Sequence, residues 1–141
     1  MHKITSSRVI KLLKKHGVQA VYLFGSQTDK TAHPGSDYDF GFLFKKGYPK
    51  DKDLAYADFE EIFAKEVAGK GSKADIVFLH QAPIALQFRA INQSKMIYVD
   101  NYNKATDYEE QTALRYLDFK PILRMFTEET IKRHSLQNYG A

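Results

Sequence analysis

Two aspartates separated by one residue are the most chemically informative feature of the sequence. Asp37 and Asp39 open an apolar segment, residues 37–44, whose composition predicts a β-strand. Because side chains alternate along a strand, the two carboxylates are expected on the same face. Their mutual repulsion would be relieved by Mg²⁺, which prefers carboxylate oxygens as ligands. The pair therefore predicts a metal site, although Asp-x-Asp after Pro34-Gly35 is also ordinary turn chemistry.

A Gly-Ser pair strengthens the metal-site interpretation. Gly25 and Ser26 follow an apolar segment, residues 18–24, at the carboxyl end of a predicted strand, where α/β sheets bind ligands. Glycine lets a phosphate approach the backbone, and Ser26 adds a hydroxyl donor at the start of a possible short helix. Ser26 could equally cap that helix, with Asp29 completing a capping box. With Ser36, the pair Gly25-Ser26 forms our predicted nucleotide-binding set.

Asp75 is the third candidate carboxylate. It opens another predicted strand, residues 75–79. If that strand lies beside residues 37–44, Asp75 comes close to the first two aspartates. Three carboxylates can hold two Mg²⁺ ions, and Asp75 could also accept the proton of an incoming hydroxyl. The alternative is an exposed carboxylate at a strand end. We predict Asp37, Asp39 and Asp75 as catalytic residues and metal ligands.

The elements that must position these residues alternate along the chain. Local patterns predict helices over residues 5–15, 54–68 and 83–93, and further strands over residues 18–24 and 96–99. Residues 104–134 have a mostly helical pattern, with a break or kink at Pro121. The expected fold is α/β (α+β): a mixed β-sheet packed with helices, in a single domain over residues 1–141.

Composition narrows the class of protein. The chain has no cysteine, which excludes disulfides and thiolate metal sites. It is 43% hydrophobic and 27% charged, and no apolar run approaches the roughly 20 residues of a membrane span, so we expect a cytoplasmic protein. The net charge of +4 suits an anionic ligand. No basic block of five or more residues occurs, so direct nucleic-acid binding is not expected.

Gly25-Ser26 with Ser36-Asp37-Tyr38-Asp39 resembles the Gly-Ser…Ser-Asp-x-Asp signature of the DNA polymerase β-like nucleotidyltransferase superfamily. The resemblance covers about residues 18–99, followed by C-terminal helices over about 104–134. The short length and the strand at residues 74–77 resemble its minimal nucleotidyltransferase (MNT) branch. The family often has an Arg after Gly-Ser and a Gly three positions beyond it, where this chain has Gln27 and Lys30.

The resemblance implies a function. Many MNT proteins are antitoxins paired with a HEPN-domain ribonuclease toxin, and members attach AMP from ATP to a toxin tyrosine. It therefore implies ATP as substrate, Mg²⁺ as cofactor with two ions expected, and a HEPN toxin as partner. Two alternatives stay open. The first is a non-catalytic antitoxin that acts by binding, which Gln27 favours because the family often has Arg at that position. The second is a small-molecule nucleotidyltransferase, although such enzymes usually have an added helical domain.

Overall fold

The predicted alternation of helices and strands is confirmed in the structure, a computed structural model that describes residues 3–25, 38–68 and 71–139. Over residues 122–139 it describes the backbone alone. The described strands are β1 (Val18–Phe24), β2 (Tyr38–Phe44), β3 (Ala74–Phe78) and β4 (Lys95–Val99). The described helices are α1 (Ser7–Lys15), α2 (Lys52–Glu66), α3 (Ile84–Asn92) and α4 (Tyr102–Tyr139), with a short 3-10 helix, η2, at Leu79–Gln81.

The four strands form one mixed sheet in the order β3-β2-β1-β4. The central strand β1 pairs antiparallel with both β2 and β4, whereas β2 and β3 are parallel. Every residue of β1 is buried, as expected for a strand covered on both faces. The carboxyl end of β1 and the amino ends of β2 and β3 therefore meet at one end of the sheet. We call this end the catalytic edge, after the predicted catalytic residues Asp39 and Asp75 that it carries.

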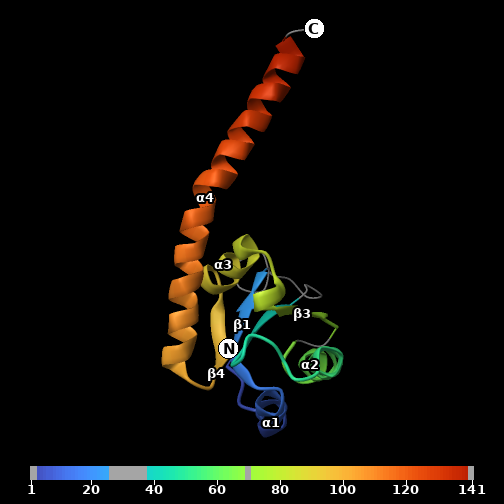
Figure 1. Cartoon of the computed structure of the whole chain (residues 1–141). Coiled ribbons are helices and arrows are strands. Elements are labelled where there is room, and N and C mark those ends of the chain that lie inside the picture. The colour runs from blue at the N-terminus through green and yellow to red at the C-terminus, as the bar shows by residue number, and fades with distance from the viewer. Residues whose placement is uncertain (1–2, 26–37, 69–70, 140–141) are drawn as a thin grey trace.

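Two hydrophobic cores lie on opposite faces of the sheet. On one face α1 and α2 pack over a cluster of phenylalanines, in which the rings of Phe42 and Phe59 stack at 4.5 Å (Figure 1). On the other face α3 and α4 cover a smaller core that includes Leu43 and Ala90. Alternation along β2 sends Phe40, Phe42 and Phe44 to the first core, so Asp39 and Leu43 point to the second.

The C-terminal helix is attached to the sheet over its first half. Tyr22 of β1 donates a hydrogen bond to Glu109 at 3.0 Å. The rings of Phe88 and Tyr116 stack with centroids 4.2 Å apart. The side chains of residues 117–121 are exposed, and Figure 1 shows the rest of α4 projecting away from the sheet.

Of the two predicted effects of Pro121, a break or a kink, the break does not occur, whereas a kink agrees with the bend of the helix. The helix runs through Pro121 without interruption, and Figure 1 shows a bend near its middle. A proline removes one hydrogen bond of the helical ladder, and a helix can absorb that loss by bending. Over the described residues, no helix combines the length and apolarity that a membrane-spanning segment requires.

Two helices, α2 and α4, start earlier than predicted, and a side chain caps the start of each. Asp51 accepts a hydrogen bond from the backbone of Leu54 at 3.1 Å, so α2 begins two residues before the predicted start. Asn101 caps α4 in the same way, accepting from the backbone of Lys104 at 3.1 Å. Leu79, predicted as the end of a strand, belongs to η2.

We expect the phenylalanine cluster to contribute much of the stability. Phe59 is fully buried and contacts the rings of Phe42, Phe44 and Phe63. Phe59→Ala should lower the free energy of unfolding by about 3–5 kcal/mol, because a cavity replaces the ring. Tyr48→Ala, at a side chain that is 64% exposed, should change it by less than about 0.5 kcal/mol. Urea denaturation followed by circular dichroism measures both, and equal effects would contradict this view of the core.

Candidate active site

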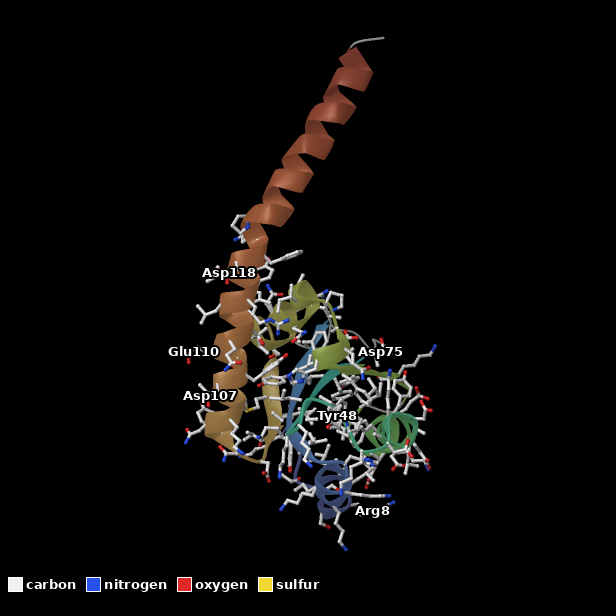
Figure 2. All side chains as sticks on the ribbon, viewed as in Figure 1. Arg8, Tyr48, Asp75, Asp107, Glu110 and Asp118 are labelled. Carbon is white, nitrogen blue, oxygen red and sulfur yellow. The ribbon has the colours of Figure 1, made fainter. Side chains whose placement is uncertain are left out.

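The structure brings two of the three predicted aspartates together. In the parallel pair of β2 and β3, Asp39 lies directly opposite Asp75. Neighbouring residues of both strands, Phe40 and Ile76, face the first core, so alternation places both carboxylates on the opposite face of the sheet. Asp39 is partly buried and Asp75 is exposed. Figure 2 shows Asp75 at the β3 side of the domain, well apart from α4. The predicted adjacency of the two strands is confirmed.

Gly25 lies against the Asp39 carboxylate at the end of β1. Phe24 pairs with Asp39 across the antiparallel ladder, which places residue 25 beside the start of β2. A Cβ atom at position 25 would overlap Oδ2 of Asp39, and the backbone there has a φ of +87°. Both features require glycine. The sequence predicted that Gly25 lets a phosphate approach the backbone. The structure shows that the missing side chain also leaves space for Asp39, a predicted metal ligand.

The remaining predicted residues, Ser26, Ser36 and Asp37, lie outside the described residues, so their roles stay predictions. Within the described part of the chain, no group of three or more His, Asp or Glu side chains is arranged to hold a metal ion. The described site therefore consists of the Asp39–Asp75 pair beside Gly25.

The phenol of Tyr56 interacts electrostatically with Asp75. Burial raises the pKa of Tyr56 above its usual value, and the negative charges of Glu60 and Asp75 raise it further. Tyr56 belongs to α2, and its ring meets that of Phe78 with centroids 6.1 Å apart. The side chain therefore stays a neutral hydroxyl at physiological pH, and it adds no third anion to the edge.

The donor set fits a hard divalent cation. Two carboxylates on adjacent strands share one face and one register position, so their charges repel each other in the absence of a cation. Carboxylate oxygens are the side-chain ligands that Mg²⁺ prefers, and two of them leave coordination positions for water and phosphate oxygens. The glycine at position 25 keeps the approach to Asp39 free of a side chain.

Comparison with known proteins defines the class. The model of the polymerase β nucleotidyltransferase family matches residues 7–103, which include the whole sheet and the Asp39–Asp75 pair. The chain belongs to this nucleotidyltransferase family. A comparison with curated proteins gives no match.

Several solved structures share the fold. One is a toxin–antitoxin complex with AMP-PNP: it is 22% identical, with a TM-score of 0.71, over 91% of this chain and 99% of that chain. Another is a tri-AMPylated HEPN toxin from Shewanella oneidensis in complex with an MNT antitoxin, at 20% identity and a TM-score of 0.65, over 88% and 93% of the two chains. A third is a MntA–HepT toxin–antitoxin structure, at 21% identity and a TM-score of 0.58, over 91% and 94%. These likenesses confirm the nucleotidyltransferase fold.

A glycine substitution tests the contact between Gly25 and Asp39. Gly25→Ala should reduce nucleotide-dependent Mn²⁺ binding and nucleotidyl transfer, because the new methyl group displaces the Asp39 carboxylate. Gly17→Ala is a matched control, since Gly17 also has a positive φ, +72°, but no atom lies within 4 Å of the added Cβ. Both variants should lose about 1–2 kcal/mol of stability through backbone strain.

Electron paramagnetic resonance of Mn²⁺ with a nucleotide measures the metal binding of both variants. Weaker binding by Gly25→Ala alone is the expected result. Equal binding by the two variants would show that the Asp39 carboxylate does not depend on the space left at Gly25.

Proposed function

We propose that this chain is an antitoxin of the MNT type, which transfers AMP from Mg²⁺-bound ATP to a hydroxyl of a cognate HEPN ribonuclease toxin and so neutralises it. A tyrosine hydroxyl is the proposed acceptor. The observation that carries the proposal is the alignment of Asp39 with Asp75 beside Gly25, in a chain of the polymerase β nucleotidyltransferase family.

The similar structures support the choice of nucleotide and acceptor. One of them holds AMP-PNP, an ATP analogue, and another contains an AMPylated HEPN toxin beside an MNT antitoxin. The two matches cover 99% and 93% of the other chains. The shared fold therefore makes the same reaction class the first hypothesis for this chain.

The residues have distinct roles in the proposed reaction. Asp39 and Asp75, with Asp37, would hold Mg²⁺, which supplies charge neutralisation for the phosphates. Gly25 allows the α-phosphate and the Asp39 carboxylate to approach each other. The acceptor oxygen forms a bond to the α-phosphorus, the bond to the β-phosphate oxygen breaks, and pyrophosphate leaves. Asp75, which is exposed, accepts the hydroxyl proton.

The arrangement of the C-terminal part favours a protein acceptor. After β4 the described chain forms the single helix α4, whose second half projects from the domain (Figure 1). One projecting helix provides an extended surface instead of the enclosed pocket that a small second substrate needs. The exposed position of Asp75 at the edge strand leaves the site open to an acceptor held on another protein.

The proposal predicts AMP transfer to the toxin. We expect the purified chain, with ATP, Mg²⁺ and the HEPN protein encoded beside it, to add AMP to a toxin tyrosine, as measured by intact-mass and peptide mass spectrometry. Asp39→Asn should lower the transfer rate at least about 100-fold, because metal sites lose that order of function when even supporting groups are removed. Its fold should stay intact, since the substitution relieves repulsion with Asp75.

Asp53→Asn is the matched control. Asp53 is an exposed aspartate in the first turn of α2, away from the catalytic edge, so its substitution should leave transfer unchanged. If the wild-type chain forms a tight complex with the toxin but adds no AMP with Mg²⁺ or Mn²⁺, the chain is an antitoxin that acts by binding. That outcome would fit Gln27 at the position where the family often has Arg.

A further inference from the structure

A pocket lies at the end of the sheet opposite the catalytic edge. It has a volume of about 510 Å³ and is bounded by the start of β1, the end of β2, η2 and the first turns of α4. Gln19 of β1 and Gly25 are six residues apart along one strand, which corresponds to roughly 20 Å. The pocket is therefore separate from the Asp39–Asp75 pair. We call it the basic pocket.

Three lysines give the basic pocket its charge. Lys45 and Lys46 follow β2, and Lys104 belongs to the first turn of α4. Lys45 forms an ion pair with Asp100 at 2.9 Å. Lys46 and Lys104 are exposed and make no ion pair with any described residue. The one acidic side chain of the lining, Asp107, does not balance them, so the described lining attracts anions.

The Gln19 side chain offers a hydrogen-bond donor to the pocket. Gln19 lines the pocket although the residue is only 3% exposed. Its Oε1 accepts a hydrogen bond from the backbone N–H of Asn101 at 3.0 Å, which assigns the amide nitrogen to the other position. That nitrogen donates to no described residue. It is not among the buried side-chain atoms of the described residues that lack a hydrogen-bond partner, so it is accessible to solvent and available to an acceptor atom of a ligand.

The lining also has apolar and aromatic side chains. Leu43 and Phe44 are buried, and the ring of Tyr108 lies 5.2 Å from that of His80. The Tyr108 hydroxyl donates to Gln87 at 2.8 Å, so this hydrogen bond holds the Tyr108 ring in place. Ring surfaces of this kind stack on nucleobases, whereas an inorganic ion would not use them.

His80 is a titratable side chain of the pocket lining. Partial burial lowers the pKa of His80 below its usual value of 6.5, and the positive charge of Arg115 lowers it further. A bound anion would act in the opposite direction, because a nearby negative charge favours the imidazolium form. The His80 titration is therefore a direct readout of ligand occupancy.

We infer that the basic pocket is a second nucleotide site, which binds the phosphate of a mononucleotide through Lys46 and Lys104, donates a hydrogen bond to the nucleotide from the Gln19 amide, and places the base against Tyr108 and His80. The volume is within the range of pockets that hold small-molecule ligands and exceeds what a phosphate ion alone requires. The proposal does not depend on catalysis at the other end of the sheet.

Titration of the ¹⁵N-labelled full chain with AMP tests the inference. The buffer contains EDTA, and the Asp39→Asn/Asp75→Asn variant is titrated in parallel, so that binding at the catalytic edge is distinguished from binding at the pocket. We expect amide shifts at Gln19, Gly47, Lys104 and Tyr108 in both proteins, together with a rise in the His80 pKa. Shifts confined to residues near Gly25 and Asp75, or lost in the double variant, would overturn the inference.

Substitutions of residues that line the pocket provide a second test of the inference. Lys46→Gln/Lys104→Gln should weaken AMP binding at least 10-fold. The control Lys11→Gln/Lys14→Gln removes the same charge from exposed lysines of α1 on the other face of the sheet and should have little effect. Gln19→Glu keeps an oxygen for Asn101 but removes the amide donor and adds a negative charge, so it should weaken binding as well. Equal losses in the two double-lysine variants would reject a specific pocket.

Two further probes distinguish ligand classes. Inorganic phosphate and adenosine should each bind more than 10-fold more weakly than AMP, since each supplies half of the contacts. If inorganic phosphate binds as tightly as AMP, the pocket is a phosphate site and the nucleotide assignment is wrong. If oligoadenylate binds tightly and AMP does not, the pocket recognises a nucleic-acid strand and the mononucleotide assignment is equally wrong.

Discussion

The parallel pairing of β2 with β3 is the interaction on which the site depends. It places the carboxylates of Asp39 and Asp75 side by side. A shift of the strand register by one residue would turn one of them to the opposite face of the sheet. Like charges in such a place oppose folding, so the pairing must be held by other contacts. The phenylalanine cluster under α2 supplies them, because Phe40 and Phe42 of β2 and Phe78 of β3 belong to one buried core.

The antiparallel pairing of β1 with β2 completes the site from the other side. It brings Gly25 to the Asp39 carboxylate, whose Oδ2 occupies the space that a side chain at position 25 would need. The same strand, β1, carries Gln19 at its opposite end. A single buried strand therefore connects the catalytic edge with the basic pocket.

The helix α4 has two parts with different surroundings. Its first half is attached to the domain through the Tyr22–Glu109 hydrogen bond and the Phe88–Tyr116 stack, and it contributes Lys104 and Tyr108 to the basic pocket. Burial and the Glu109 charge raise the pKa of Tyr22, so that hydroxyl stays protonated and the hydrogen bond persists at physiological pH. The second half projects and is available to a partner (Figure 1).

The sequence alone determined what depends on local order. Alternation along residues 37–44 predicted that Asp37 and Asp39 share one face, and helix and strand signals predicted the order of elements, because both are properties of a few consecutive residues. Only the tertiary structure decided that Asp75 lies opposite Asp39, since strand register is set by packing between segments 36 residues apart in the chain. The basic pocket had no sequence signature, because Gln19, Lys46, His80 and Lys104 come from four separate elements. Ser26, Ser36 and Asp37 remain predictions of the sequence motif.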